Sequence, residues 1–368
     1  AGGAALSRRR GQAGARALLQ TTRQRGSPGS ANPSALNFNP LMRFCLQDKQ
    51  VRARKGQDLS AGEVALSECL RRPRSKCHAD PGEIKEAIDG LMGMRLLNRP
   101  PPCMVVHSGS TDPECSTTKG NKETGPERWT NRMRAKLKNF PGGGKATYPP
   151  PRADLRRGAF SSCALVGNAP HIKHAPNGQH IDRFEAVIRF NHILKVDPTR
   201  GHRLHMGTKT TFRMFSRSAS FDLAEGKMHI VPGRNERGWM FWHDKSQHAF
   251  EAIRRRGGEV PLMMLSPAMI NWQLEVYFTL RKDMRRLGLG PFGCPRNVNS
   301  GMHMLLLTQH LCGKVGLFGI SHTSALATRP GAHLGDPSHI ASRFHDWDFD
   351  TLVVRLLHLS NRLSVCTV

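Results

Sequence analysis

The stretch CALVGNAPHIKHAPNGQHIDRFEAVIRFN, residues 163–191, decides the fold of this chain. It opens with a short apolar run, Cys163–Val166, which a glycine follows directly. It closes with a second, mostly apolar run, Ala186–Asn191. Short apolar runs bounded by turn residues are typical of buried strands. We therefore predict two buried strands in this stretch.

The residues that follow alternate predicted strands with predicted helices. Met228–Val231 is a candidate third strand, and Phe250–Gly258 has the pattern of a helix that ends at glycine. The remaining predicted elements are a helix over Asn271–Gly290, a buried helix over Gly301–Leu311, a strand over Lys314–Ile320 and a helix over Asp350–Leu359. Strands that alternate with helices predict an α/β fold, in which a central, mostly parallel sheet is flanked by helices.

Composition divides the chain into three parts. Residues 1–40 are rich in Gly, Ala, Arg and Ser, and we expect them to be disordered or stem-like. Residues 41–150 form a stem or N-terminal extension of unknown structure. The segment FPGGGKATYPPP, residues 140–151, marks a boundary by composition. Residues 151–368 are the predicted folded domain.

One segment of the extension has a helical pattern. It is GEIKEAIDGLMGMRLL, Gly82–Leu97, and a run of three prolines that starts at Pro100 ends it. The apolar residues that fall on one face of this predicted helix are Ile84, Ile88, Leu91 and Met92.

The chain of 368 residues is strongly basic, with 55 Lys and Arg against 28 Asp and Glu and a formal net charge of +27. The excess is spread along the chain, so it is not a basic tail. Such a charge fits a nucleic-acid-binding protein, and it fits equally a protein that handles phosphorylated or acidic substrates. Only 6% of the residues are aromatic and only 2 are Tyr, which argues against a surface that stacks on nucleic-acid bases.

Two further counts exclude other protein classes. No apolar stretch approaches the roughly 18 residues that a membrane-spanning helix needs, so we expect no membrane span in this sequence. The nine cysteines form no CxxC pair, which argues against zinc fingers and zinc ribbons. Their odd number leaves at least one cysteine unpaired if the others form disulfides.

Asparagine follows both of the first two predicted strands. Asn168 comes after Val166 and Gly167, and Asn191 ends the next strand. Ligands of open α/β sheets bind at the carboxyl ends of the strands, glycine permits close approach, and an asparagine amide both donates and accepts hydrogen bonds. The two asparagines are therefore candidate ligand contacts, although such turns also occur for purely structural reasons.

Small polar residues, Asn297–Gly301, precede the predicted helix that continues to Leu311. The first N–H groups of a helix have no partner within the helix, and they suit a phosphate or a carboxylate. The alternative is an ordinary helix cap without a ligand.

Two histidines and an acidic run lie near the C-terminus. Either His333 or His345 could act as a general base or hold charge on a leaving phosphate, because imidazole titrates near neutral pH. Asp346, Asp348 and Asp350 have the D-x-D spacing that could bind a divalent metal ion. A solvated acidic turn, or charges that favour a helix N-terminus, would give the same pattern.

Taken together, the order of these segments resembles the eukaryotic sialyltransferase family. Residues 163–191, continued by GTKTT at Gly207–Thr211, resemble its long motif, and Asn297–Ile320 resembles its small motif. His333 lies in a segment similar to the third motif, and His345 with Asp350 five residues later resembles the very small motif. The resemblance covers about residues 160–358.

The resemblance implies a Rossmann-like nucleotide-sugar transferase fold, a variant of the GT-A type. It also implies an inverting glycosyltransferase that moves sialic acid from CMP-sialic acid to a hydroxyl group of an acceptor glycan. In that reaction His345 would be the general base, and His333 would contact the departing CMP phosphate. No metal or other cofactor is expected, which would make the D-x-D spacing coincidental.

The resemblance assigns further residues to binding and to stability. Asn168 and Asn191 would bind the cytidine nucleotide, and Ser300 and Gly301 would contact it from the start of a helix. A second implication is a disulfide between Cys163 and Cys312, for which the alternative is two buried thiols.

The sequence also departs from the family pattern. Ala169 and Pro170 replace the usual serine and its successor, and Leu334-Gly335 replaces an aromatic pair after His333. Asn299-Ser300-Gly301 stands where the family has Ser-Thr-Gly, and Asp350 replaces a glutamate. These departures lie near sugar-contacting positions, so transfer of another CMP-linked ulosonic acid, such as a Kdo-type sugar, is an alternative. An inactive member of the family and a basic nucleic-acid-binding protein are two more.

The expected partners follow from the same resemblance. They are a CMP-linked sugar donor and an acceptor glycan on a glycoprotein or glycolipid, with no nucleic acid. Family members are type II membrane proteins of the Golgi apparatus that act in glycosylation. We therefore expect the Golgi lumen as the location, with a membrane anchor upstream of the residues present here.

Overall fold

The computed structural model describes residues 58–72, 80–100, 103–105, 155–191, 198–226, 236–242, 260–295, 298–321 and 345–366, with single residues at 323, 325 and 328. The predicted strand at Met228–Val231, the predicted helix at Phe250–Gly258 and His333 lie outside the described residues. So do residues 1–40.

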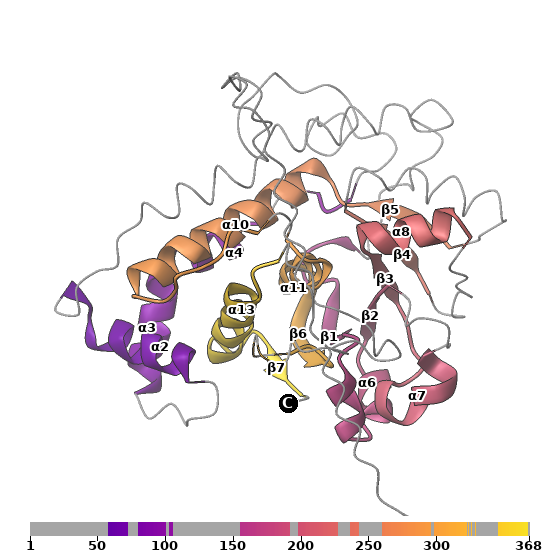
Figure 1. Cartoon of the computed structure of the whole chain (residues 1–368), viewed down its shortest axis with the longest axis horizontal. Helices are drawn as coiled ribbons and strands as arrows, with labels where there is room; N and C mark the ends of the chain where they lie inside the picture. Colours follow the sequence, from indigo (N-terminus) through magenta and orange to yellow (C-terminus); the bar gives the residue numbers. More distant parts are fainter. Residues whose placement is uncertain are drawn as a thin grey trace, which may run out of the picture. The chain divides into compact units, whose positions relative to one another are not determined.

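A seven-stranded sheet forms the centre of the described structure (Figure 1). Its strands are β1 (Phe160–Val166), β2 (Ala186–Phe190), β3 (Phe212–Phe215), β4 (Gly238–Phe241), β5 (Leu262–Met264), β6 (Cys312–Phe318) and β7 (Ser364–Val365). Their order is β5-β4-β3-β2-β1-β6-β7, and all neighbouring pairs are parallel. The predicted α/β class with a parallel sheet flanked by helices is confirmed.

The strand order reverses between β1 and β6. The chain runs outward from β1 through β2, β3 and β4 to β5, and then returns to place β6 on the other side of β1. At such a reversal the connections after the two strands leave toward opposite faces of the sheet and open a crevice at their carboxyl ends. The fold therefore places a crevice after Val166 and Phe318, the last residues of β1 and β6.

Helices cover both faces of the sheet. Along β1, Cys163 and Leu165 belong to a large hydrophobic cluster, and the alternate residues Ala164 and Val166 belong to a smaller one. The large cluster takes in residues of α10 (Pro267–Arg286), α11 (Ser300–Leu311) and α13 (Trp347–Leu359). The smaller cluster takes in residues of η4 (Pro170–His174), α6 (Gly178–Asp182) and α7 (Pro198–Met206).

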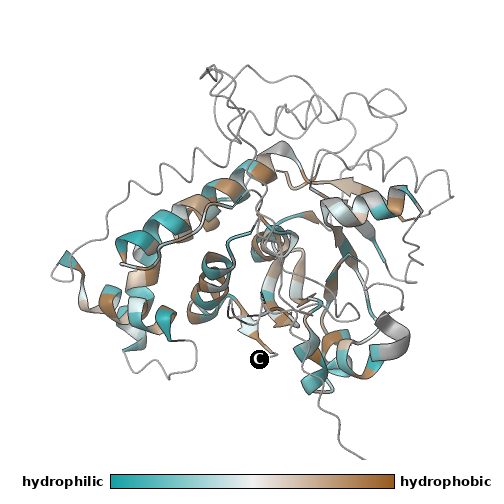
Figure 2. Ribbon diagram, viewed as in Figure 1, coloured by the Kyte–Doolittle hydropathy of each residue, from teal (hydrophilic) through white to brown (hydrophobic). Residues whose placement is uncertain are grey.

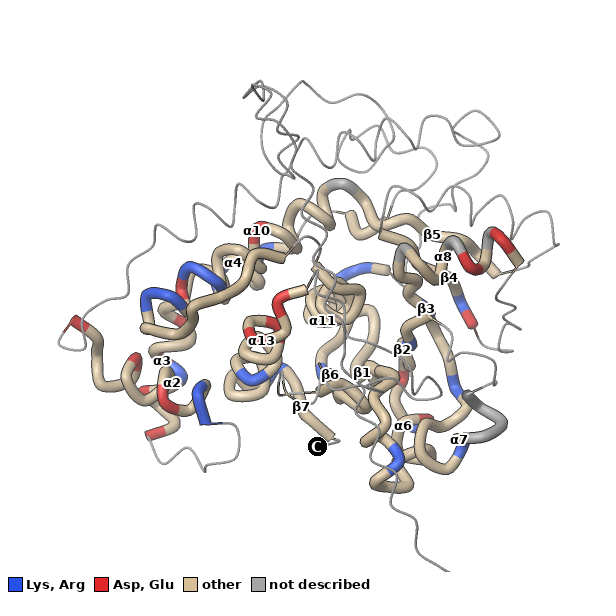
Figure 3. Tube along the Cα trace, in the orientation of Figure 1, with Lys and Arg blue, Asp and Glu red and all other residues tan. Residues whose placement is uncertain are grey.

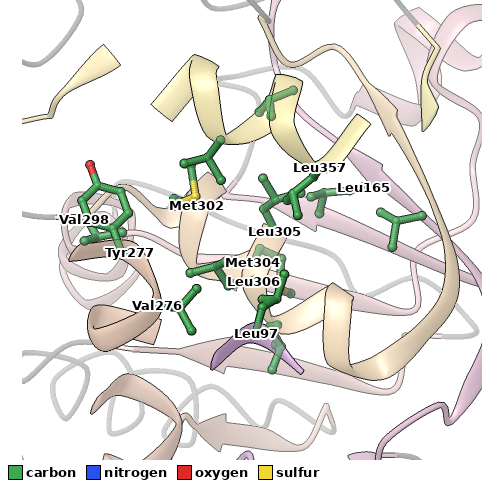
Figure 4. Close-up of a cluster of buried hydrophobic side chains, with 14 of the residues drawn as sticks. Leu97, Leu165, Val276, Tyr277, Val298, Met302, Met304, Leu305, Leu306 and Leu357 are labelled. Carbon is green, nitrogen blue, oxygen red and sulfur yellow. The ribbon is translucent and has the colours of Figure 1, made fainter. Parts of the chain in front are cut away.

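The helix α11 lies in the large cluster with nine of its twelve residues buried. Figure 4 shows Met302, Met304, Leu305 and Leu306 of this helix among residues of α10, α13 and β1. The buried residues of α11 are mostly apolar, as a core helix requires, and the buried polar residues among them are His303, Thr308 and His310. The longer helix α10 carries both hydrophilic and hydrophobic residues along its length (Figure 2). The remaining described helix of the domain is α8 (Arg217–Ala224).

Three helices before residue 151 belong to the same core. They are α2 (Ala61–Arg71), α3 (Pro81–Gly90) and α4 (Met92–Leu97). Leu66, Ile88 and Met94 of these helices are almost fully buried in the large cluster, and α4 packs along α10. The hydrophobic core therefore includes part of the segment expected to be a stem or extension, and it does not begin at residue 151.

The single helix predicted over Gly82–Leu97 is two helices. Leu91 between them has an extended backbone, with φ −69° and ψ 129°, so the helical repeat does not continue through it. Ile84, Ile88 and Leu91 are buried as predicted, but Met92 is 47% exposed because it lies beyond this break. None of the helices in the described parts of the chain is long and apolar enough to cross a membrane.

A disulfide joins Cys163 of β1 to Cys312 of β6, with 5.9 Å between their Cα atoms. It links residues 149 positions apart and confirms the pairing that the family resemblance implied. Cys69, Cys103 and Cys294 are also disulfide-bonded, whereas Cys366 is a free thiol.

Replacing Cys163 and Cys312 together by alanine is expected to lower the free energy of unfolding by about 4 kcal/mol, because the disulfide closes a long loop in the unfolded chain. Urea denaturation followed by circular dichroism measures the change. The matched control is Cys366→Ala, which removes a thiol without opening a loop and should change the stability far less. Equal stability of the double variant and the control would contradict the prediction.

Candidate functional site

A cavity of about 320 Å³ lies at the crevice between β1 and β6. Its walls come from the residues that follow β1, β2, β3 and β6 and from the N-terminal turns of α11 and α13. The residues of the predicted site that line it are Asn168, Asn191, Ser300, Gly301 and His345. The structure thus gathers in one place residues from four separate segments of the sequence.

Gly167 lines this cavity, and the loop that follows β6 leaves no room for a side chain at this position. A Cβ atom at this position would lie 2.4 Å from the carbonyl oxygen of Gly319, which follows β6. The two loops approach closely because Gly167 N–H donates to Phe318 O at 2.8 Å and Ala169 N–H donates to Gly319 O at 2.9 Å. The packing of one loop on the other thus accounts for this glycine without a ligand.

Asn168 connects the ends of β1 and β2. Its Nδ2 donates to the carbonyl oxygen of Phe190 at 3.5 Å, a long hydrogen bond. The Oδ1 atom has no hydrogen-bond partner within the described part of the chain. Asn168 therefore offers an acceptor to the cavity.

Asn191 has a left-handed backbone conformation, with φ +46°. Its N–H donates to Met214 O at 2.8 Å, and its Oδ1 accepts from the N–H of Ser216 at 2.6 Å. Among the described residues nothing accepts from its Nδ2. Asn191 therefore offers a hydrogen-bond donor to the cavity, whereas Asn168 offers an acceptor.

Helix α11 begins at the cavity with unpaired N–H groups. Asn299 caps the helix, because its Oδ1 accepts from Met302 N–H at 2.7 Å. The hydroxyl of Ser300 accepts from Trp242 Nε1 at 3.0 Å, which fixes the first turn. The N–H groups of Ser300 and Gly301 have no partner in the described structure, so they suit an anion. The helix cap and the anion site proposed from the sequence are compatible.

Asp350 of α13 connects this helix start to the core. It is buried, and it accepts from Asn299 Nδ2 at 2.5 Å and from the hydroxyl of Tyr277 at 2.9 Å. Burial, with a smaller contribution from the nearby Asp346, raises the pKa of this carboxyl group to about 7 in spite of the two hydrogen bonds, which lower it.

Asp346 has a different partner, Arg281 of α10. The guanidinium donates to Asp346 Oδ2 at 2.5 Å and to Gly293 O at 2.7 Å, and the arginine is fully buried. Asp346 Oδ1 also accepts from Phe349 N–H, so this ion pair sets the start of α13. Figure 3 shows the acidic residues at this end of α13, facing α11.

The D-x-D spacing does not form a metal site in the structure. Asp346 is held by Arg281 and Asp350 by two donors, while Asp348 is exposed. No group of His, Cys, Asp and Glu within the described ranges is placed to hold a metal ion. The acids instead fix the N-terminal turns of two helices.

His345 directly precedes the cap residue of α13 and is half-buried in the cavity wall. Its ring lies edge-on to Trp347, with 5.3 Å between the ring centroids. The Arg281–Asp346 ion pair fixes the neighbouring backbone, so the position of this imidazole depends on buried charges.

Several residues of the site were missed from the sequence. Ser216 follows β3 just as Asn191 follows β2, and it lines the cavity. Strand β3 is short and contains Arg213, which obscured its apolar pattern. Nothing in the sequence indicates that Tyr277 and Arg281 reach the start of α13, because these contacts join residues 65 or more positions apart.

The sequence matches glycosyltransferase family 29 (sialyltransferase) over residues 114–361, more than half of the chain. The chain belongs to this sialyltransferase family. Family 29 membership and the parallel α/β sheet together confirm the family and fold that the sequence motifs indicated.

Several members of the family are similar to this chain in sequence. A Bos taurus beta-galactoside alpha-2,6-sialyltransferase 2 is 25% identical over 238 residues, which are 59% of this chain and 45% of the relative. A Homo sapiens alpha-N-acetylgalactosaminide alpha-2,6-sialyltransferase 6 is 23% identical over 46% of this chain and 50% of the relative. A Gallus gallus beta-galactoside alpha-2,6-sialyltransferase 2 is 39% identical over 46% of this chain and 32% of the relative.

The match to these sialyltransferases spans half or less of their length. A crystal structure of a mammalian sialyltransferase in complex with Gal-beta-1-3GalNAc-ortho-nitrophenol is 15% identical, with a TM-score of 0.45 over 76% of this chain and 97% of that chain.

The raised pKa of Asp350 predicts a pH dependence of stability. The folded chain holds this proton up to about pH 7, and the unfolded chain releases it near the ordinary value of 3.8. Between these values the unfolded state binds fewer protons, so the contribution of Asp350 to stability falls as pH rises. The free energy of unfolding of the wild type relative to Asp350→Asn should therefore decrease between about pH 4 and pH 7.

Urea denaturation of both proteins across this pH range measures the effect. Asp348→Asn is the matched control, because Asp348 is exposed on the same helix and should leave the pH profile unchanged. A difference between wild type and Asp350→Asn that stays constant with pH would show that the carboxyl group ionises normally in the folded chain, and one that rises with pH would show that folding lowers its pKa.

Proposed function

We propose that this chain transfers sialic acid from CMP-sialic acid to a hydroxyl group of an acceptor glycan, with inversion at the anomeric carbon. The observation that carries the proposal is the gathering of Asn168, Asn191, the start of α11 and His345 around one cavity. Membership in family 29 supports the donor and the type of reaction.

The cavity has groups suited to a CMP-linked sugar. The unpaired N–H groups of Ser300 and Gly301 can bind the phosphate, which the positive end of the α11 dipole also favours. The acceptor on Asn168 and the donor on Asn191 can bind the polar groups of the cytidine. The net charge of +27 suits a donor that carries both a phosphate and a carboxylate.

In the proposed step His345 accepts the proton of the acceptor hydroxyl. The acceptor oxygen forms a bond to the anomeric carbon as the bond from that carbon to the phosphate oxygen breaks. The electron pair of the breaking bond stays on the phosphate, and CMP leaves. A general base and groups that stabilise the phosphate charge are the two requirements of this step.

We also propose that His333 stabilises the leaving phosphate, on the strength of its place in the third motif of the family. The reaction proposed here uses no metal ion. Two observations support this: Asp346 is paired with Arg281, and Asp350 already accepts two hydrogen bonds.

We propose the Golgi lumen as the location. Family membership supports this, and so does the disulfide between Cys163 and Cys312, because disulfides persist in oxidising compartments. The acceptor would be a glycan of a glycoprotein or glycolipid that passes through the same compartment.

Calorimetric titration tests the donor class first. The full chain, whose core includes α2–α4, should bind CMP more tightly than UMP in the presence of EDTA. Binding without preference between CMP and UMP would argue against a CMP-linked donor. If CMP binds but CMP-sialic acid is not a substrate, CMP-Kdo is the donor to assay next.

His345→Ala should lower the transfer rate at least a hundredfold, or about 2.7 kcal/mol, because it removes the general base. It should leave the affinity for CMP nearly unchanged, since the nucleotide contacts are elsewhere. Transfer is assayed with labelled CMP-sialic acid and a galactoside acceptor. The control is His358→Ala, near the other end of α13, and a rate loss no larger than that of the control would remove His345 as the base.

A further inference from the structure

The conformation of Asn191 depends on a buried arginine of the next strand. Asn191 has a left-handed backbone, with φ +46°, which asparagine adopts more readily than most residues, and three contacts hold it in this conformation. Two of these contacts are the hydrogen bonds to Met214 and Ser216. The third is from Arg213, whose Nη1 donates to the carbonyl oxygen of Asn191 at 3.1 Å.

Arg213 reaches this carbonyl because another residue orients its guanidinium. Its Nε donates to Glu236 Oε1 at 2.9 Å, and Trp239 Nε1 donates to the same oxygen at 2.7 Å. The side chains of the ion pair are 8% and 0% exposed. A buried charge pair without further hydrogen bonds would be costly, so this pair is held in one geometry by its neighbours.

Arg189, which lies opposite Arg213 on the neighbouring strand β2, makes different hydrogen bonds. The two arginines are paired in the parallel register of β2 and β3. The guanidinium of Arg189 donates to Met206 O, Lys209 O and Thr210 Oγ1, and so fixes the turn before β3. Arg213, by contrast, donates to the main chain of Asn191, a residue of the cavity wall.

We propose that Arg213, oriented by Glu236, is a positioning residue that holds Asn191 so that its amide group faces the donor nucleotide. The inference rests on the proposed function, because it assumes that Asn191 binds CMP. Glu236 neutralises the charge of the guanidinium. Arg213 therefore acts through its hydrogen bond to the backbone of Asn191 and not through electrostatic attraction of the donor phosphate. Lysine cannot replace it, because an ammonium group lacks the planar fork that serves both partners.

A double-mutant cycle on the affinity for CMP tests this proposal. The variant Arg213→Met/Glu236→Gln removes both charges together and leaves no single buried charge behind. It should weaken CMP binding about tenfold, the effect of roughly one well-placed hydrogen bond. In the Asn191→Ala background the same pair of substitutions should cause no further loss, since the residue that they position is then absent.

The matched control is Arg355→Met. Arg355 also donates to a main-chain carbonyl, that of Leu70, at 2.6 Å, and it does not line the cavity. This control should lose stability and keep its affinity for CMP. If the double variant does not fold, Arg213→Lys retains the charge beside Glu236 and carries the same test.

The outcomes separate this inference from the proposed function. If the wild type does not bind CMP, the proposed function fails and this inference fails with it. If the wild type binds CMP and the Arg213 variants bind it equally well, only the positioning role is overturned. An equal loss with and without Asn191 would likewise overturn that role, because it would show a general structural effect.

Discussion

The parallel pairing of β1 with β6 is the constraint on which the rest of the structure depends. It reverses the strand order and so opens the cavity at the ends of these strands. It also brings Cys163 within disulfide distance of Cys312, although 149 positions separate them. Gly167 and Gly319 permit the two loops to cross in contact, and a side chain at Gly167 would meet the backbone of Gly319 at 2.4 Å. The cavity, the disulfide and the contact between the two loops therefore all follow from the pairing of β1 with β6.

Hydrogen bonds between buried polar groups fix the N-terminal turns of α11 and α13 at this cavity. Arg281 holds Asp346 at the start of α13, Asp350 holds Asn299 at the start of α11, and Trp242 holds Ser300. Each of these bonds joins residues more than 50 positions apart. Isolated buried charges would destabilise the fold, but here each one has a partner and sets a helix terminus. The same contacts serve stability and the geometry of the site.

The sequence predicted the longer strands β1, β2 and β6 and the helix α11, and it missed β3, β4 and β5, which are only three or four residues long. β1, β2, β6 and α11 are five to twelve residues long, and each contains a run of at least three buried residues that the sequence shows, although β2 also contains Arg189. β3 has only four residues and Arg213 is the second of them, so no apolar run is left to recognise; this arginine is buried with hydrogen bonds to Glu236 and Asn191. The candidate residues Asn168, Asn191, Ser300, Gly301 and His345 were predicted from motifs, but their supports were not. Such supports depend on tertiary contacts that no local pattern records.

Two departures from the family pattern meet in one hydrogen bond. Asn299 stands where the family has serine and is longer, and Asp350 stands where the family has glutamate and is one methylene shorter. The structure places Asn299 Nδ2 2.5 Å from Asp350 Oδ2, so the longer residue on α11 reaches the shorter one on α13. Asn299 still caps α11 through its other side-chain atom, Oδ1. The two residues that depart from the family pattern thus bond to each other and tie the start of α11 to α13 at the cavity wall, so both contribute to holding the site together.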